Sequence, residues 1–389
     1  MIASLRHLRL VLEVQRTRSV TRAAAAFNLS QPAVTTALTG LEARLGVALF
    51  DRHPSGVTPT PVGAALCLRI ARAFAVLDPA LSELSARLVL TASHAKIRAV
   101  IAVAETESFS AAARLLGIAQ PTVHRAVAEM EGEAGQALFS RTAHGVIPTR
   151  PVRHLAIAAQ LAFSEFEQAR VDIAEVLGRE AGRVVIGAMP LARSVLLGPA
   201  IARFRASGRN IPVRVVEGPY SELSLGLRRG EIDFLVGALR PDVDDLQQEP
   251  LLTDELTIVC RPDHPAFGQD ADMRRLAHWP WIVAPEGTPA RDHFHRLFAG
   301  AKDIPVRLVE TGSMELMVNL VSQTDHLGFV SARQVQGVVQ KGFLAQLASL
   351  LPGTSRAIGL TFRSSWHPTR AQSDMVAAIR CVAAQAETA

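Results

Sequence analysis

Apolar residues follow a helical spacing at the start of the chain. Four of them predict an amphipathic first helix with one buried face: Leu5, Leu8, Val11 and Leu12. A short second helix is expected next, with Thr21 as its N-cap and the small residues Ala23 and Ala24 on its inner face. Asn28 tolerates the left-handed backbone conformation that ends such a helix. Two helices joined by a tight turn are therefore predicted first.

A third helix and a two-stranded hairpin follow. Ser30 is the expected N-cap of this helix, Pro32 lies in its first turn, where a missing N–H group costs little, and Gly46 ends it. Residues 49–59 predict two short strands around a turn at 55–56. Three helices and a hairpin in this order predict a winged helix-turn-helix unit.

The same pattern occurs twice along the chain. Seventeen of the 44 positions from 19 to 62 carry the same residue type 89 positions later, without a gap. Chance would produce only a few identities, so the unit is an internal duplication. The second copy keeps the fold signals, with Gly117 in the turn. Ala119 stands where the first copy has the capping Ser30, which weakens the start of that helix by about 1 kcal/mol.

A long amphipathic segment follows each copy. After the first copy, apolar residues recur at steps of three or four: Leu66, Ile70, Ala73, Leu77, Leu81, Leu84 and Leu88. The same spacing follows the second copy: Leu155, Ala159, Ala162, Phe166, Ala169, Ile173 and Val176. Each segment predicts one long helix whose apolar stripe needs a partner.

From Gly182 onward, short apolar runs alternate with helical patterns. Eight runs predict strands: residues 184–187, 213–216, 232–237, 256–260, 281–284, 306–309, 327–330 and 358–362. Helices are expected at 196–204, at 222–229 and from about residue 368. Buried strands separated by single helices are typical of right-handed βαβ units around a parallel sheet. The C-terminal half is therefore expected to be an α/β domain.

The first copy contains the stretch S-V-T-R-A-A-A-A-F-N-L-S-Q-P-A-V-T-T-A-L, followed by L-F-D-R and T-P-T, and so resembles the LysR-type transcriptional regulators. The resemblance runs over nearly the whole chain. It implies a unit whose third helix enters the major groove of double-stranded DNA. The expected DNA contacts are Ser30, Gln31, Pro32, Ala33, Thr35, Thr36 and Arg52. Gln can bond adenine edges, Ala and the Thr methyl can touch thymine methyls, and Arg52 is placed for a phosphate or the minor groove.

The second copy departs from the family, whose members normally carry one such unit. Its candidate DNA contacts are Gln120, Thr122, His124, Arg125 and Arg141. His124 and Arg125 replace two threonines and can bond guanine or phosphate. Glu129 replaces Gly40 and Glu133 replaces an arginine, so the unit is near neutral. The second copy is either a second DNA reader with a different sequence preference or a unit kept for packing.

In the family, the linker helix pairs antiparallel with that of a second subunit. Our hypothesis is that the two linker helices of this chain pair with each other and make an intrachain pseudo-dimer. The alternative is that each helix pairs across a true dimer. The resemblance also implies a homo-oligomer, either a dimer or a tetramer.

The C-terminal half resembles the effector domain of the same family, which looks like a periplasmic binding protein with two α/β lobes around a cleft. The matching segments are E-G-P-Y-S-E-L, L-R-R-G-E-I-D-F-L-V-G-A-L-R-P and C-R-P-D-H-P. The chain is expected to cross between the lobes near 260–265 and 350–357. The expected fold is thus multidomain: two all-α winged helix-turn-helix units at 1–62 and 94–151, linker helices at 63–93 and 152–181, and a two-lobed effector domain at 182–389, with lobe I at 182–260 and 358–389 and lobe II at 261–357.

Ligands of open parallel sheets bind at the carboxyl ends of strands, where helix N-termini offer free N–H groups. The candidate effector contacts in the segments there are Met189, Leu191, Ser194, Tyr220, Ser221, Gly287, Thr288, Thr311 and Ser313. Ser221 and Ser313 each precede a predicted helix, and capping that helix is the better interpretation of each serine taken alone. Tyr220, the one tyrosine of the chain, either lines the cleft or packs beneath it. Several helix N-termini in one cleft favour a small-molecule effector that carries a carboxylate.

Charge is unevenly distributed over the chain, whose net charge is +5. Residues 1–93 hold ten Arg and five acidic residues, a balance of +5, whereas 94–180 balance at −1 and the remainder at +1. The positive excess therefore lies with the first winged unit, where it attracts a phosphate backbone. We expect the first unit to be the main DNA anchor.

Other features exclude rival classes. No run of about 18 uncharged apolar residues occurs and the N-terminus lacks a signal-peptide core, so a cytoplasmic protein without membrane contact is expected. Cys67, Cys260 and Cys381 are far apart in sequence and predict buried structural thiols. The chain has no P-loop, G-x-G-x-x-G, H-E-x-x-H or G-x-S-x-G motif, so no metal, cofactor or catalytic residue is expected. A regulator is favoured over an enzyme and over a solute-binding protein for transport, which would need an export signal.

Overall fold

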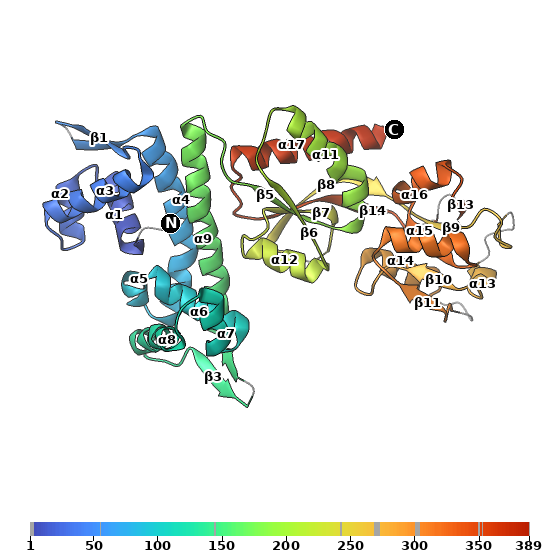
Figure 1. Cartoon of the computed structure of the whole chain (residues 1–389), viewed down its shortest axis with the longest axis horizontal. Coiled ribbons are helices and arrows are strands. Elements are labelled where there is room, and N and C mark those ends of the chain that lie inside the picture. Colours follow the sequence, from blue (N-terminus) through green and yellow to red (C-terminus); the bar gives the residue numbers. More distant parts are fainter. Residues whose placement is uncertain are drawn as a thin grey trace. The chain divides into compact units, whose positions relative to one another are not determined.

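A computed structural model describes residues 4–54, 56–143, 145–241, 243–267, 273–299, 304–348, 351 and 353–388. The chain forms two compact units (Figure 1). One unit comprises Met1–Arg183 with Arg228–Glu231, and the other comprises Val184–Leu227 with Ile232–Ala389. Each unit has hydrophobic clusters of its own.

The first winged unit has the predicted three helices and hairpin. Its elements are α1 (Leu5–Thr17), α2 (Val20–Ala26), α3 (Gln31–Leu45), β1 (Phe50–His53) and β2 (Gly56–Pro59). Ser30 caps α3, and Gly46 ends it in the left-handed conformation with a φ of 71°. The prediction for the second helix was wrong at its start: Ser19 rather than Thr21 is the N-cap, because its hydroxyl accepts the Arg22 N–H group.

The second copy has the same elements in the same order. They are α6 (His94–Thr106), α7 (Phe109–Leu116), α8 (Gln120–Ala134), β3 (Phe139–Thr142) and β4 (Gly145–Pro148). As predicted, α8 begins at Ala119 without a side-chain cap. In both copies a left-handed residue holds the hairpin by its carbonyl, because Arg18 O accepts the Val57 N–H group at 3.1 Å and Glu107 O accepts that of Val146 at 3.0 Å. The duplication therefore preserves how the wing is attached.

Each copy continues into a long helix, α4 (Pro61–Leu84) and α9 (Arg150–Val176), with the short α5 (Leu88–Thr91) after α4. The two long helices pack against each other within one chain (Figure 1). They run antiparallel, as three contacts show: Glu83 with His154, Phe74 with Phe166 and Arg69 with Asp172. The hypothesis of intrachain pairing is confirmed.

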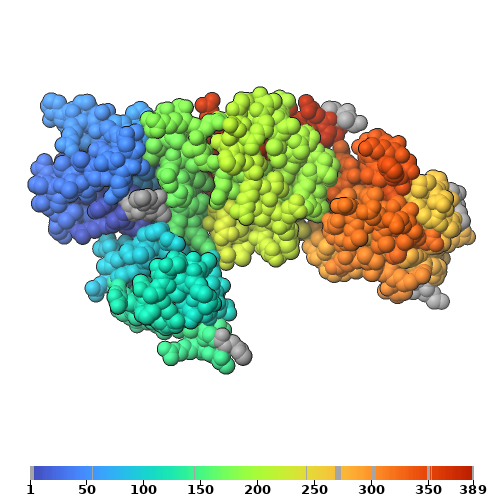
Figure 2. All heavy atoms as spheres, viewed as in Figure 1, coloured from blue at the N-terminus to red at the C-terminus, as the bar shows by residue number. Residues whose placement is uncertain are grey.

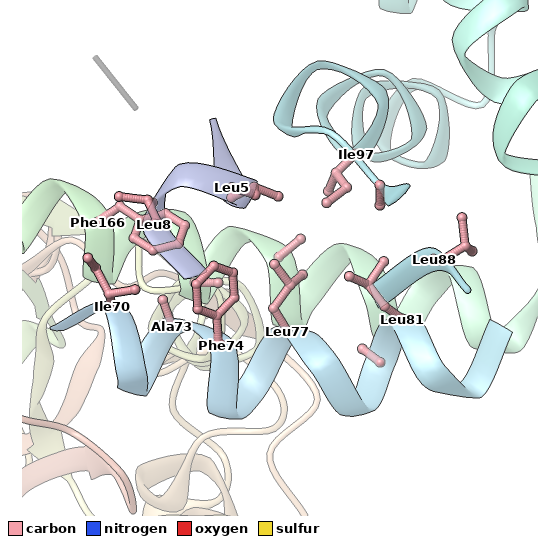
Figure 3. Packing of buried hydrophobic residues seen from close by; sticks show 14 of the residues in the cluster. Leu5, Leu8, Ile70, Ala73, Phe74, Leu77, Leu81, Leu88, Ile97 and Phe166 are labelled. Carbon is pink, nitrogen blue, oxygen red and sulfur yellow. The ribbon is translucent and has the colours of Figure 1, made fainter. Parts of the chain in front are cut away.

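The core of this unit runs along the seam between α4 and α9 and into both winged units (Figure 3). Residues from both copies belong to one continuous cluster, among them Leu5, Leu8, Ile70, Phe74, Leu77, Leu81, Leu88, Ile97 and Phe166. The predicted stripes of both linker segments supply much of it. The start of α4 approaches the backbone before the hairpin closely. A Cβ at Gly63 would lie 1.9 Å from the carbonyl oxygen of Leu49, so only glycine fits there. The two copies thus share one core instead of forming separate globules.

The other unit contains two five-stranded sheets. The sheet of lobe I has the order β6-β5-β7-β14-β8. Its strands are β5 (Val184–Ala188), β6 (Val213–Glu217), β7 (Phe234–Ala238), β8 (Leu246–Asp254) and β14 (Arg356–Arg363). Its helical segments are α10 (Pro190–Ala192), the π-helix η1 (Arg193–Leu197), α11 (Gly198–Ala206), α12 (Tyr220–Arg228) and α17 (Arg370–Thr388). β5, β6 and β7 are parallel, whereas β14 runs antiparallel to both β7 and β8.

The sheet of lobe II has the order β11-β10-β12-β9-β13. Its strands are β9 (Leu256–Cys260), β10 (Trp281–Val283), β11 (Leu308–Glu310), β12 (Leu327–Ser331) and β13 (Ala345–Ala348). The helices beside it are α13 (Met273–Leu276), α14 (Pro289–Leu297), α15 (Met314–Gln323) and α16 (Ala332–Gln340). β9 runs antiparallel to β12 and β13. The two-lobed α/β fold is confirmed, but both sheets are mixed and not purely parallel as expected.

The boundary between the lobes also differs from the expected one. β8 ends at Asp254 in the first sheet and β9 begins at Leu256 in the second, so the chain crosses at Glu255 and the boundary expected after residue 260 was wrong. The chain returns before Arg356, where β14 begins. This return crossing lies within the expected segment 350–357.

Candidate nucleic-acid interface and effector site

The face of α3 that was predicted to meet DNA is open to solvent. Its exposed residues are Ser30, Gln31, Pro32, Ala33 and Thr36, with Thr35 half-buried. Val34, Leu38 and Leu41 on the opposite side are buried, which sets the rotation of the helix. The Ser30 hydroxyl accepts the Ala33 N–H group at 3.4 Å and is thus engaged in capping. Four predicted contacts of α3 itself are therefore exposed to solvent: Gln31, Pro32, Ala33 and Thr36.

The first unit also carries free positive charge. Four exposed arginines make no ion pair with a described residue: Arg18, Arg22, Arg44 and Arg52. Arg52 lies on β1 of the wing, opposite Val57. The positions 89 residues later hold Glu107, Ala111, Glu133 and Arg141. The second unit thus keeps a cation at only one of these four positions. Because free guanidinium groups bind phosphates, these four positions favour the first unit for phosphate contacts.

The second unit holds part of its recognition face in internal contacts. The His124 ring stacks on Phe109 of α7, with centroids 3.9 Å apart and planes 9° from parallel. Gln120 Nε2 lies 3.4 Å from His124 Nε2, and Gln120 Oε1 accepts the Ser110 hydroxyl at 3.0 Å. Two of the five predicted contacts are therefore fixed in orientation by α7 and by each other.

Thr122, Arg125 and Arg141, the remaining predicted contacts, are exposed. Arg125 stands at the position of Thr36, so the second recognition helix has gained a cation where the first has a hydroxyl. In Figure 2 the second winged unit is the teal body, from which the β3–β4 hairpin projects. These three side chains are available to a phosphate backbone or to base edges.

The acidic residues peculiar to the second unit are partly neutralised. Lys96 of α6 lies 3.1 Å from Glu129 and 2.9 Å from Glu133. Its hydrogen bond to Glu133 raises the pKa of Lys96. The pKa of Glu133 is lowered first by a hydrogen bond from Thr91 and then by Lys96. One lysine thus offsets part of the negative charge that would repel DNA.

In lobe I, the predicted effector residues fall into different environments. Met189 follows β5 and is 7% exposed, and a Cβ at Gly237 would lie 2.4 Å from its Cε atom, so its side chain covers that glycine. Leu191 is 4% exposed and belongs to the core of lobe I, which argues against its predicted role as an effector contact. Ser194 is exposed and its hydroxyl donates to Leu191 O at 3.2 Å.

Tyr220 and Ser221 lie at the start of α12, after the carboxyl end of β6. Tyr220 is half-buried, and the guanidinium carbon of Arg240 lies 4.9 Å from its ring centroid. Ser221 is exposed and lies within α12, so its interpretation as a residue that precedes and caps the helix was wrong.

In lobe II, the predicted hydroxyl groups serve the backbone. Thr288 caps α14 by accepting the Arg291 N–H group at 3.2 Å. Ser313 caps α15, as one of its two interpretations predicted. Thr311 accepts the Ser313 N–H group at 3.0 Å, and Gly287 is exposed with a φ of 72°. The N-termini of α14 and α15 therefore lie at the carboxyl ends of β10 and β11.

Arg240 joins the two lobes at this edge, although it was absent from the predicted site. It follows β7, and its Nη1 donates to Gly287 O at 3.2 Å. Gln248 holds its backbone by two hydrogen bonds of 2.9 and 2.7 Å. The Nε atom of Arg240 is buried without a hydrogen-bond partner among the described residues, and burial lowers the pKa of the Arg240 guanidinium. Arg240 follows the carboxyl end of β7, so the rule that ligands bind at the carboxyl ends of parallel strands also points to this residue.

Comparison with known families decides what these parts belong to. Residues 5–64 and 94–151 each match the helix-turn-helix domain described as bacterial regulatory helix-turn-helix protein, lysR family. Residues 177–384 match the LysR substrate binding domain. The chain belongs to the LysR family. It is a DNA-binding transcription regulator with an effector-binding domain, and its DNA-binding region is duplicated.

Relatives of this LysR regulator support the assignment. The HTH-type transcriptional regulator GalR of Pseudomonas putida is 34% identical over 387 residues, which is 98% of each chain, so the alignment includes both winged units. A probable hydrogen peroxide-inducible genes activator of Mycobacterium leprae is 29% identical over 276 residues, 70% of this chain and 88% of its own.

Two solved structures share the fold. Full-length OxyR from Pseudomonas aeruginosa superposes with a TM-score of 0.54 at 22% identity, covering 74% of this chain and 97% of its own. CbnR, a LysR family transcriptional regulator, superposes with a TM-score of 0.52 at 18% identity, covering 74% of this chain and 98% of its own.

Two buried cysteines of this LysR regulator, Cys67 and Cys260, are poorly suited to redox sensing. Burial raises the pKa of Cys67 to about 12 and that of Cys260 to about 11, so both thiols are protonated at neutral pH. Cys381 is half-buried, and all three are free. Among the described residues, no group of three or more His, Cys, Asp or Glu side chains is arranged to hold a metal. Within the same described part of the chain, no helix has the length and hydropathy that a membrane span requires.

Proposed function

We propose that this LysR regulator reads DNA through both winged units, which contact two unlike half-sites of one operator, and that an effector bound between the lobes controls that binding. The carrying observation is the antiparallel pairing of α4 with α9 in one chain. In regulators of this general kind, two recognition helices related by a twofold axis meet two half-sites about 34–36 Å apart. Here one chain supplies both helices, and they differ in sequence.

The first unit acts as the anchor. Gln31, Thr35 and Thr36 provide groups for base edges, and exposed arginines of the same unit provide phosphate contacts. The second unit adds a weaker reader with its own preference. Arg125 and Arg141 are among its exposed cations.

A second candidate is favoured by the absence of cations from the second unit at the positions of Arg18, Arg22 and Arg44: the second unit would serve assembly alone. Two observations support the DNA-reading proposal instead. The recognition face of α8 is exposed, and the hairpin beside it retains Arg141 at the position of Arg52.

A nuclease footprint on DNA upstream of the protein's own gene tests the proposal. Thr35→Ala/Thr36→Ala and His124→Ala/Arg125→Ala should each remove protection from a different part of the site. Protection that survives intact in the second variant would assign the second unit to assembly. Equal loss across the whole site in both variants would contradict two separate readers.

For the effector, we propose a small molecule that carries a carboxylate, bound beside Arg240 and Tyr220. The buried Nε of Arg240 needs an acceptor, and a carboxylate supplies one in the geometry that guanidinium groups prefer. The N-termini of α14 and α15 at the same strand ends add further N–H donors.

We further propose that the regulator works in the cytoplasm, where its DNA partner lies, and by binding alone, without a catalysed reaction or a cofactor. It acts as a homo-oligomer of such chains. Since the linker helices already pair within the chain, contacts between chains fall to other surfaces.

A further inference from the structure

Arg69 is a charged residue in the middle of an apolar seam. It lies on α4 and its side chain is 2% exposed. Three polar side chains of α9 contact its guanidinium: Glu165 at 2.9 Å, Gln168 at 2.6 Å and Asp172 at 2.6 Å. Glu165 and Gln168 are themselves buried. Because a buried charge is tolerated only when it is paired and hydrogen-bonded, this linker cluster of four residues requires α9 to lie against α4 in the observed register.

The linker cluster is not repeated by the duplication. The residue 89 positions after Arg69 is Ala158. The residues 89 positions before Glu165, Gln168 and Asp172 are Val76, Pro79 and Glu83. Each linker helix therefore carries one half of the cluster and lacks the other half.

We propose that the linker cluster selects the pairing of α4 with α9 and excludes pairing of two copies of α4, or of two copies of α9, from different chains. In an α4–α4 pair of the same geometry, each Arg69 would face Val76 and Pro79, with Glu83 as its one acidic neighbour. In an α9–α9 pair, the buried Glu165 would face Ala158. Each wrong pair thus leaves a buried charge poorly paired, twice over.

This inference concerns assembly and stands apart from the proposed function, since it holds whether or not the second unit reads DNA. In this role the linker cluster determines which helices pair. It favours pairing of α4 with α9 of the same chain over pairing with the same helix of another chain. The two unlike DNA-binding units are thereby kept together in one chain.

The test must remove the covalent connection, because tethering alone favours pairing within a chain. A protease site inserted after the exposed Ala86, between α4 and α5, allows the folded full-length chain to be cut into residues 1–86 and the remainder. Native mass spectrometry then counts one-to-one complexes and homodimers of the 1–86 piece. With the natural cluster, the pieces should stay together one to one.

The apolar variant Arg69→Met/Glu165→Met/Gln168→Leu should fold, because replacing the buried members of an ion cluster by apolar residues is often neutral. Asp172 is retained, since its side chain is 22% exposed. After cleavage, the ratio of homodimer to one-to-one complex should rise by about tenfold or more in this variant. The reason is that the free-energy cost of an unpaired buried charge, which the variant no longer carries, exceeds the free energy that corresponds to a tenfold change in the ratio. Arg170→Met, which removes an arginine with a 62% exposed side chain from the same helix α9, is the matched control and should behave as wild type.

Two results overturn the proposal: homodimers of the 1–86 piece with the natural cluster, or an apolar variant that stays one to one. Glu165→Gln/Asp172→Asn keeps Arg69 but neutralises its acidic partners, and it is the second arm if the apolar variant does not fold. It should also raise the homodimer ratio, and wild-type behaviour there counts equally against the cluster. None of these measurements involves DNA, so failure here is distinct from failure of the proposed DNA readout.

Discussion

His124 stacks face to face on Phe109, with ring centroids 3.9 Å apart and planes 9° from parallel. The same positions of the first copy hold Thr35 and Val20, so the stack is a feature of the second copy alone. It orients an imidazole on the recognition helix before any DNA is bound. Such preorganisation would lower the entropy cost of the DNA contact that we propose for His124.

Removing the stacking partner should therefore weaken the second half-site. We expect Phe109→Leu, which keeps an apolar side chain at the helix start, to lower affinity for DNA containing that half-site by about two- to tenfold, since aromatic pairs contribute about 0.5–1.5 kcal/mol. Fluorescence anisotropy with one half-site scrambled at a time measures this. An equal effect on the first half-site would show that the change acts through folding and not through His124.

The salt dependence of binding should identify the anchor. Replacing Arg18, Arg22 and Arg44 by Gln removes three free cations that the second unit lacks. The slope of log affinity against log salt should become shallower by about 0.9 for each phosphate that the protein no longer neutralises. The measurement is a titration of operator DNA at several salt concentrations. Arg170→Gln serves as control, and a slope unchanged in the triple variant would remove these arginines from the interface.

The linker cluster should also show in stability. Arg69→Met leaves Glu165 buried without its cation, which should destabilise the first compact unit by about 3–5 kcal/mol. Arg69→Met/Glu165→Leu should recover most of that loss, because the second change removes the unpaired charge. Urea denaturation of the full-length chain, followed by a probe in the first unit, measures both. Equal destabilisation by the single and double variants would mean that packing, and not charge, accounts for the effect.

Acid should weaken the same unit through His94. This residue begins α6 and packs against Phe163, with ring centroids 4.5 Å apart. Desolvation by burial, followed by the charge of Arg98, lowers the pKa of His94 in the folded chain. The unfolded chain therefore binds the proton more readily. The stability that His94 contributes is present above its unfolded pKa of about 6.5 and is lost as pH falls from there through the lower folded value.

Thermal unfolding of wild type and His94→Phe between pH 7.5 and pH 5 measures this dependence. The variant should lose less stability on acidification than the wild type. Parallel curves would assign the pH dependence of this unit to other groups.

Periodicity and duplication made the DNA-binding half predictable. The winged units contain short-range signals such as the Ser30 cap, the Gly46 stop and the apolar stripe of α1, each local in sequence. The linker cluster around Arg69 had no such signal, because it joins residues about one hundred positions apart. From sequence alone, a single arginine beside an apolar stripe is expected to be exposed to solvent. Long-range ion pairs become visible only when the fold is known.

The effector half was predicted less completely for a related reason. Continuous apolar runs identify buried strands such as β5 and β7, but β8 mixes exposed and buried residues along its length and so lacked that signature. Without β8, the crossing at Glu255 could not be located. The antiparallel position of β14 between β7 and β8 depends on that same strand.

The last prediction concerns the effector. Arg240→Met removes the guanidinium, which donates to Gly287 O and lies over the Tyr220 ring, and leaves an apolar side chain of similar length. The effector domain should therefore remain folded while losing its carboxylate partner. Thermal shift of the full-length chain with acetate, succinate and benzoate, each compared with its amide, should show stabilisation by at least one acid and not by its amide. The variant should lose that stabilisation, because binding to the folded state alone is what raises the melting temperature. Arg203→Met, an exposed arginine of α11, is the matched control and should respond as wild type. A carboxylate that stabilises the Arg240 variant as well as the wild type would place the site elsewhere on the domain, and an amide that stabilises both equally would rule out charge recognition.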